Sequence, residues 1–211
     1  MEITWYGQGC FRMTERATLA VVTDPFDGSA GMEPPKLKAD VVTISKVDDP
    51  KSNNISAIVG AQRGDVRKIT GPGEYEMGGV FITGVAMKAD KKSTEKTTVY
   101  AFNFDGLTVA HLGGLSFVPT QSQIDALETV DVLLVPVSGE GELSASQASE
   151  VISMIEPSIV VPMGYGAKRT EALNKFLKEM GISSPKSQEL LKVTKNQLPE
   201  DTQVVLLEVK S

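Results

Sequence analysis

The residues that most often build metal and nucleophilic sites are scarce in this chain, which has one histidine, His111, and one cysteine, Cys10. An ordinary zinc site takes about four ligands, most of them histidine nitrogen or cysteine sulfur. The composition therefore argues against an ordinary zinc site built from one chain. Cys10 lies in an apolar strand pattern with no base near it in the sequence, so we interpret it as a small buried hydrophobe rather than a nucleophile.

Two other segments contain residue types that could carry chemistry. Ser45 ends an apolar run and Lys46 follows it, which is the residue pair of a serine–lysine hydrolase. Neighbouring strand residues point to opposite faces, however, and this disfavours a shared site. The segments 71–73 and 78–79 are rich in glycine, but neither has the Gly-Lys-Ser/Thr ending or the following helix of a phosphate-binding loop. They are typical of turns between strands.

The first half of the chain, which contains most of these residues, is predicted to form β-strands. Short runs of β-branched and aromatic residues alternate with glycine-rich or charged breaks in the first half. The expected strands cover residues 2–6, 10–14, 18–23, 40–44, 80–85, 99–104 and 107–111. Asp105-Gly106 predicts a tight hairpin between the last two of them.

The second half of the chain alternates helices and strands. Capping boxes at Thr120 and Ser144 predict two helix starts, and an apolar face that ends near Gly181 predicts a third helix. Strands are expected over residues 132–137, 159–161, 190–193 and 204–209. This order predicts one domain over residues 1–211 of the α+β class, an αββα sandwich in which two packed mixed sheets are flanked by helices.

The composition of the chain restricts its expected cellular location and the classes of partner that it could bind. The formal net charge is −6 and 41% of the residues are hydrophobic, which is typical of a globular protein. An acidic surface repels phosphate backbones, so nucleic acid is not an expected partner. The sequence shows neither a signal-peptide pattern nor a long apolar stretch, and a single cysteine fits a reducing compartment. We therefore expect a cytoplasmic protein without membrane association.

Several segments, taken in order, resemble the metallo-β-lactamase superfamily, in particular its short cytoplasmic branch similar to ascorbate-6-phosphate lactonase. The resemblance runs from Ile3 to about Val209. It rests on TWYGQGCF (4–11), TDPF (23–26), ADVVTIS (39–45), ITGPGEYE (69–76), HLG (111–113) and VPM (161–163). It implies the αββα metallo-β-lactamase fold and a hydrolase-like ancestry.

The same resemblance places the metal ligands of that family on unsuitable residues. The family's loop His-x-His-x-Asp-His falls at residues 46–51, and further ligands follow downstream. The former metal-site positions are occupied here by Lys46, Asp48, Pro50, Lys51, Ala89, Gly114 and Gly164. Only Asp48 among them could bind a metal. The resemblance therefore implies a degenerate zinc site and a pseudoenzyme.

Other residues are candidates for the cleft around these positions. They are Gln8, Asp24, Asp49, Glu74, Asp90 and His111. Because Mg²⁺ prefers carboxylate oxygens, a hard-cation site is one alternative, although Lys46 and Lys51 would compete with the cation. The same lysines could instead replace the lost metal charge beside Asp24 and Asp48, or the loop could project into water.

Two further features lie near the implied cleft. His111 precedes the Leu-Gly of its motif, and we expect a hydrogen-bonded histidine at a strand end rather than a ligand. The segment 138–142, with Glu140 and Glu142, follows a strand at a place where this family has substrate-facing loops. Its default interpretation is an exposed loop, and its glutamates could meet a cationic group.

These expectations lead to a functional hypothesis. The family mechanism needs metal-bound water as its source of hydroxide. We therefore expect a non-catalytic, metal-free protein with no cofactor and no catalytic residue, which binds a small molecule or a protein partner. Two alternatives stay open: a hydrolase of ester, lactone or phosphate substrates with a rebuilt, non-histidine site, and a structural subunit beside an active relative. The sequence does not identify the ligand or the oligomeric state.

Overall fold

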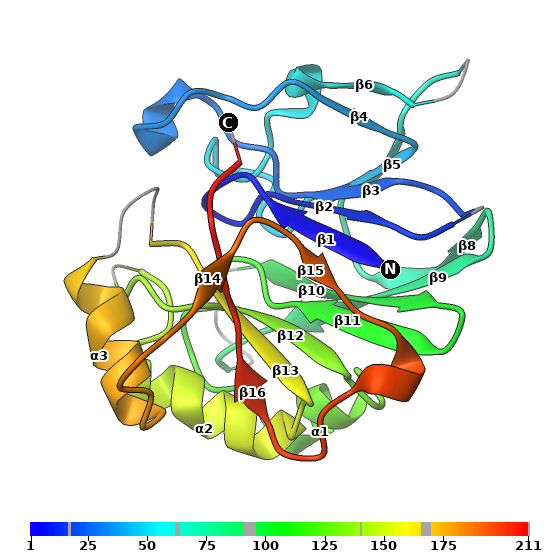
Figure 1. The fold of residues 1–211 in the computed structure, drawn as a ribbon. Coiled ribbons are helices and arrows are strands. Elements are labelled where there is room, and N and C mark those ends of the chain that lie inside the picture. The colour runs from blue at the N-terminus through cyan, green and yellow to red at the C-terminus, as the bar shows by residue number, and fades with distance from the viewer. Residues whose placement is uncertain (17, 62–63, 91–95, 140, 166–169, 211) are drawn as a thin grey trace.

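The chain folds as two stacked β-sheets with α-helices along one outer face (Figure 1). The computed structural model describes residues 1–16, 18–61, 64–90, 96–139, 141–165 and 170–210. The first sheet has six strands in the order β15 (Leu191–Lys192), β1 (Glu2–Trp5), β2 (Phe11–Thr14), β3 (Val21–Thr23), β5 (Val41–Thr43) and β7 (Arg67–Ile69). The predicted architecture of two packed mixed sheets is confirmed.

The second sheet has seven strands and contains most of the longer ones. Their order is β16 (Gln203–Val204), β13 (Ile159–Met163), β12 (Val132–Pro136), β11 (Leu107–His111), β10 (Thr97–Phe104), β9 (Val80–Met87) and β8 (Gly73–Met77). Strands β10 and β11 form the predicted hairpin, with Asp105 and Gly106 at φ +50° and +83°. Positive φ at both turn residues is the geometry for which Asp-Gly is favoured.

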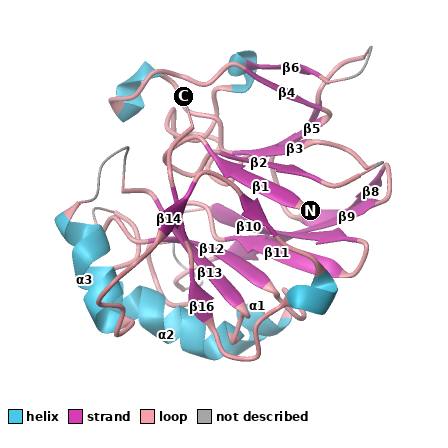
Figure 2. Ribbon diagram, viewed as in Figure 1, coloured by secondary structure: helices cyan, strands magenta, loops and turns pink. Residues whose placement is uncertain are grey.

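In the described part of the chain each α-helix follows a capping residue, and the first two begin where the sequence predicts. Helix α1 (Gln121–Asp125) follows Thr120, α2 (Ala145–Ile155) follows Ser144, and α3 (Glu171–Glu179) follows Thr170. The Thr120 and Ser144 capping boxes are both formed. Figure 2 shows all three helices on the outer side of the seven-stranded sheet. The buried residues of α2 and α3 belong to the main core.

The outer side of the six-stranded sheet is covered differently. A two-stranded pair, β4 (Leu37–Ala39) and β6 (Ile58–Gly60), lies there with the short 3₁₀ turns Gly28–Ala30 and Ile55–Ala57. A second small core forms beneath them from Cys10, Val22, Phe26, Leu37, Ala39, Val42, Ile44 and Ile58. Cys10 is fully buried, as its apolar strand pattern predicts. In the described part of the chain, this outer layer therefore contains no α-helix.

Tyr100 ties the two sheets together. Its ring is buried on β10 of the seven-stranded sheet, and its hydroxyl donates to the Ile44 carbonyl at 3.1 Å, just beyond β5 of the six-stranded sheet. The Ile69 and Gly71 carbonyls lie at 3.4 Å from the same hydroxyl. A buried hydroxyl with such partners fixes the spacing of the two sheets near the ends of their strands.

The C-terminal segment closes the molecule across one side. It runs from β16 to β17 (Leu206–Leu207), which pairs with β14 (Ser187–Gln188), and Figure 1 shows it in red, crossing from the helical side to the six-stranded sheet. Lys210 donates its backbone N–H to the Trp5 carbonyl at 2.9 Å. Within the described residues, no helix is long and apolar enough to cross a membrane.

Candidate functional site

A polar cleft of about 440 Å³ opens at one edge of the sandwich, where strands of both sheets end. The six-stranded side contributes Gln8, Asp24, Ser45, Lys46, Asp49 and Lys51, and the seven-stranded side contributes Gly113, Gly114, Ser138, Glu142, Gly164 and Tyr165. Residues far apart in the sequence thus meet because strand ends of both sheets collect at this edge.

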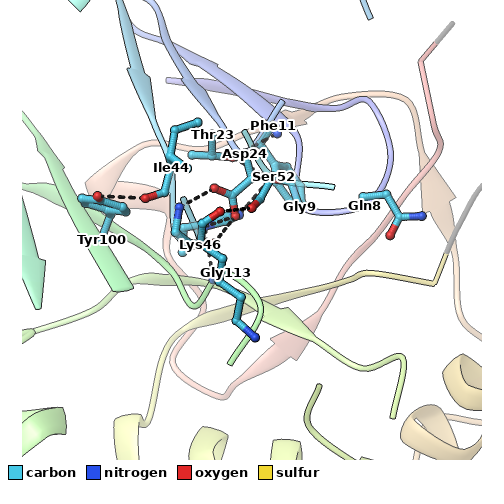
Figure 3. A network of polar contacts seen from close by, with 12 residues as sticks. Gln8, Gly9, Phe11, Thr23, Asp24, Ile44, Lys46, Ser52, Tyr100 and Gly113 are labelled. Carbon is cyan, nitrogen blue, oxygen red and sulfur yellow. Dashed lines mark hydrogen bonds and ion pairs between the residues drawn. The ribbon is translucent and has the colours of Figure 1, made fainter. Parts of the chain in front are cut away.

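Asp24 and Ser45 form the closest polar pair in the cleft. Ser45 donates its hydroxyl to Asp24 Oδ2 at 2.5 Å and its backbone N–H to Asp24 Oδ1 at 2.7 Å. Asp24 follows β3 with φ +38°, a left-handed conformation that is costly for a residue other than glycine. Figure 3 shows the Asp24 carboxylate at the centre of this network, with Gln8 to one side and its amide pointing away. Two hydrogen bonds from one residue thus hold the carboxylate in place.

Burial sets the proton affinity of Asp24. Removal from water raises the pKa of this carboxyl to about 7, because the charged form loses its hydration. The hydrogen bonds from Ser45 oppose the rise, and the neighbouring Asp49 and Glu142 carboxylates add to it. A carboxyl group with a pKa near neutrality can take up and release a proton at physiological pH.

His111 lies beneath the cleft rather than in its wall. Its Nε2 is 2.9 Å from the Gly9 carbonyl, and the Gly113 backbone N–H donates to its Nδ1 at 3.2 Å. This pairing fixes the neutral tautomer with the proton on Nε2. Burial lowers the pKa of His111 to about 4. The histidine therefore holds two glycine segments of the cleft in position as a neutral group.

Those glycines are required by close packing. A Cβ on Gly113 would lie 2.5 Å from Ser45 Oγ, and one on Gly9 would lie 3.3 Å from Asp24 Oδ2. Gly113 also has φ +57°. A side chain at either position would press on the Asp24–Ser45 pair.

Glu142 supplies a second carboxylate with its own serine. Ser138 donates its hydroxyl to Glu142 Oε2 at 2.7 Å. Burial raises the pKa of Glu142, while the Ser138 hydrogen bond and the charges of Lys46 and Lys51 lower it. The two lysines thus act on the carboxylate of Glu142. They are not among the groups that shift the pKa of Asp24.

Lys46 and Lys51 come from one tight turn. Ser52 donates its hydroxyl to the Lys46 carbonyl at 2.7 Å, and Lys51 donates its backbone N–H to Asp49 Oδ1 at 2.9 Å. The Lys46 side chain runs along the backbone of Gly114, where an added Cβ would lie 3.4 Å from Nζ. The turn thus places the half-buried Lys46 ammonium group along the cleft wall.

The structure brings only part of the sequence-derived set together. Gln8, Asp24, Asp49, Lys46, Lys51, Gly114 and Gly164 line the cleft. Asp48, Pro50, Ala89 and Asp90 are exposed and outside its lining. Glu74 is on β8, where it lines a different hollow beside Phe81. Ala89 and Asp90 follow β9, which pairs with β10 and the edge strand β8 rather than with the strands whose ends form the cleft.

Sequence reasoning missed several lining residues. Ser52, Met163, Tyr165 and Thr170 all line the cleft. Their types are common on surfaces and in cores, so only the fold reveals them. Glu142 lay in a segment that was singled out for its position after a strand. Its companion Glu140 lies outside the described residues.

The metal of the resembling family can be tested against these side chains. In the part of the chain that the structure describes, no three His, Cys, Asp or Glu side chains gather so that they could hold a metal ion. The carboxylates Asp24 and Glu142 are instead engaged by serine hydroxyls. These residues do not fit the metal that the family implies, and no chemical step through a metal is derived from them.

Comparison with known proteins decides the family. Residues 2–164 match the family described as the beta-lactamase superfamily domain. The chain belongs to this superfamily. A solved Thermotoga maritima structure, named as a candidate zinc-dependent hydrolase of the metallo-beta-lactamase superfamily, is 30% identical, with a TM-score of 0.75 over 99% of this chain and 100% of that one. The resemblance inferred from sequence motifs and the metallo-β-lactamase fold are both confirmed.

Curated relatives within the superfamily carry similar names. A UPF0173 protein of Pyrococcus furiosus is 28% identical over 197 residues, which cover 85% of this chain and 90% of the relative. A UPF0173 metal-dependent hydrolase of Thermoplasma acidophilum is 23% identical over 190 residues, or 78% of this chain and 83% of that one. The name of the second relative points to hydrolysis.

These names correct three of the predictions. The expectation of a non-catalytic protein is wrong, because similar superfamily members are named hydrolases and the hydrolase alternative fits better. The interpretation as a pseudoenzyme with a degenerate zinc site is wrong on the same grounds. The expectation of no cofactor is also wrong, since the names imply a metal. Neither the single histidine nor the residues at the former metal-site positions decide metal dependence or activity.

Proposed function

We propose that this chain is a hydrolase of ester, lactone or phosphate substrates, that its ligand is a small molecule, and that the reaction takes place at Asp24 and Ser45. The observation that carries the proposal is the contact of 2.5 Å between Ser45 Oγ and Asp24 Oδ2 in the wall of the polar cleft. The names of similar superfamily members support hydrolysis as the reaction class.

Asp24 is the base of the proposed reaction. In its charged form the carboxylate takes the proton of Ser45 Oγ, and the oxygen attacks the carbonyl carbon or phosphorus of the substrate. Asp24 then passes this proton to the leaving oxygen, so that a covalent Ser45 ester and a charged Asp24 remain. Water then cleaves this ester with Asp24 again as base, which regenerates the hydroxyl and releases the acid. A pKa near 7 suits a base for this step.

Positive charge in the cleft supports the negative oxygen that develops during attack. Lys46 and Lys51 both line the same wall as Ser45. Ammonium groups stabilise such an oxygen most strongly where water is excluded. The cleft thus combines a base, a hydroxyl and two cations.

The proposal is tested with p-nitrophenyl acetate, a γ-lactone and a p-nitrophenyl phosphate diester. Each is assayed with chelator and with added Zn²⁺ or Mn²⁺, because similar proteins are named metal-dependent. Asp24→Asn and Ser45→Ala should each lower kcat/KM by about 100-fold or more. The control is Ser153→Ala on the outer helix α2, where Ser153 Oγ donates only to the Ser149 carbonyl.

Two readouts identify the role of Ser45. After a rapid quench of the wild-type reaction, mass spectrometry should find a peptide that contains Ser45 and carries the additional mass of the acyl group. The fraction of this peptide that is acylated should be smaller in Asp24→Asn. If Ser45→Ala turns over substrate as fast as the wild-type protein, Ser45 is not the nucleophile. If none of the three substrates is hydrolysed under any metal condition, the hydrolase proposal is wrong.

A further inference from the structure

A second cavity lies beside the cleft and differs from it in chemistry. Its volume is about 1140 Å³, above the range of roughly 300–1000 Å³ that is common for small-molecule sites. Its walls come from the segment 31–37, from the C-terminal segment 206–210, and from residues of β1 and α3. No step of the proposed hydrolysis uses this cavity.

Most of the residues that line the cavity are apolar. They include the aromatic and aliphatic side chains of Trp5, Tyr6, Met32, Leu37, Tyr165 and Val209. Charged residues such as Glu33, Lys36 and Lys210 are exposed and lie toward the rim. An apolar interior with a polar rim is typical of a site for a non-polar group that enters from solvent.

The cavity and the cleft share a wall. Tyr165 lines both of them, and its ring packs on Trp5 with centroids 4.8 Å apart. Trp5 Nε1 donates to the carbonyl of Gln8 at 2.9 Å, and Gln8 lines the cleft. A molecule that reached past Tyr165 would therefore place one end beside Ser45 and the other among apolar side chains.

We propose that this cavity binds the apolar acyl chain of an ester or lactone substrate whose reactive carbonyl lies in the cleft. The inference rests on the proposed function and narrows its substrate class to esters of medium-length fatty acids. We choose this occupant because the polar cleft and the cavity meet at Tyr165, so one molecule can extend from the first into the second. Burial of each methylene group from water favours binding, so longer chains gain affinity until the cavity is filled.

Binding can be measured without hydrolysis. Trp5 is the only tryptophan of the chain, so intrinsic tryptophan emission reports on this cavity. Octyl methyl ketone, which has no bond to hydrolyse, should change this emission in a saturable manner. Val209→Phe and Pro185→Phe, each of which adds bulk to a wall, should weaken ketone binding several-fold. Val59→Phe is the matched control, because Val59 is exposed on β6 and outside the lining.

Turnover supplies the second readout. With p-nitrophenyl esters from acetate to octanoate, kcat/KM should rise by about tenfold or more along the series. Val209→Phe and Pro185→Phe should lower octanoate turnover more than acetate turnover, whereas Val59→Phe should leave the ratio unchanged. Circular dichroism identifies any variant that does not fold.

The outcomes separate this inference from the proposed function. Ketone binding that both cavity variants weaken, without hydrolysis of any ester, would support the cavity and overturn only the proposed hydrolase. Hydrolysis with a flat chain-length series would overturn the cavity as the acyl site and leave the hydrolase standing. An emission that does not respond to the ketone would also overturn the inference.

Discussion

The Glu142 carboxylate fills the space next to Gly164, because a Cβ on Gly164 would lie 2.5 Å from Glu142 Oε2. The two residues come from different loops, one after β12 and one after β13. Ser138 holds the carboxylate there by a hydrogen bond of 2.7 Å. A side chain at position 164 and a glutamate at position 142 are therefore mutually exclusive in this conformation.

Gly164→Ala should lower the free energy of unfolding by more than backbone strain alone explains. Gly181→Ala is the matched control, because Gly181 has φ +69° and open space around its Cβ, whereas Gly164 has φ +84° and meets Glu142. Strain at such an angle costs on the order of 1 kcal/mol. Urea unfolding should show at least about 1 kcal/mol of additional loss for Gly164→Ala, and Glu142→Ala should recover part of it. Equal losses at both glycines would contradict the steric coupling.

The pH dependence of stability should contain two opposing contributions. Asp24 has a folded pKa of about 7, above an unfolded value of about 3.9, so its contribution is present at low pH and is lost as the pH rises toward 7. His111 has a folded pKa of about 4, below an unfolded value of about 6.5, so its contribution is lost as the pH falls toward 4. Between pH 4 and 6.5 the two slopes oppose each other.

Single variants should reveal each slope in turn. Asp24→Asn leaves the His111 contribution, so stability should increase with pH from about 4 to about 6.5. His111→Gln leaves the Asp24 contribution, so stability should decrease with pH from about 4 to about 7. Each slope can reach about 1.4 kcal/mol per pH unit. Urea unfolding at several pH values measures both, and parallel profiles for the two variants would contradict the assignment.

Removal of either cleft lysine should change the titration of Glu142. The charges of Lys46 and Lys51 lower the pKa of this carboxyl, so Lys46→Met and Lys51→Met should each raise it. Carbon NMR of the glutamate carboxyl groups measures the shift directly. Lys192→Met is the control, since the Lys192 ammonium pairs with Glu2 at 3.2 Å. An unchanged Glu142 titration in both lysine variants would show that these charges do not act in the cleft.

Loss of the Tyr100 hydroxyl should weaken the link between the sheets. Tyr100→Phe leaves the buried Ile44 carbonyl without this donor, and the free energy of unfolding should fall by about 1–3 kcal/mol. Tyr75→Phe is the control, because Tyr75 is only half-buried and its hydroxyl contacts the Gly71 and Pro72 carbonyls at 3.3 and 3.4 Å. If chemical denaturation shows the same loss of unfolding free energy for both variants, the Tyr100 hydrogen bond does not stabilise the contact between the sheets.

Local signals in the sequence predicted much of the fold. The serine and threonine caps located α1 and α2, and Asp105-Gly106 located the hairpin, because each of these features depends on neighbours in the chain. The strands β4, β6, β7, β8 and β14 were missed. Three of them, β4, β6 and β7, have three residues each, too few to show a period, and they form through parallel partners distant in the sequence.

The candidate site was less accessible to sequence reasoning. Asp24 could be named because its motif places it at a strand end, but its pairing with Ser45 depends on the parallel register of β3 and β5. Alternation along a strand predicted that Ser45 and Lys46 point apart, whereas both line the cleft. Lys46 already lies in the turn beyond β5, where that rule no longer applies.

The pairing of β1 with β15 has a consequence for synthesis on the ribosome. Glu2 and Ile3 pair with Lys192 and Leu191. Strand β1 therefore leaves the ribosome long before its partner β15 has been synthesised. Until then its edge presents unpaired N–H and C=O groups, which can pair with other chains. Nascent chains should therefore depend on chaperone shielding or rapid elongation, and stalling before residue 191 should promote aggregation.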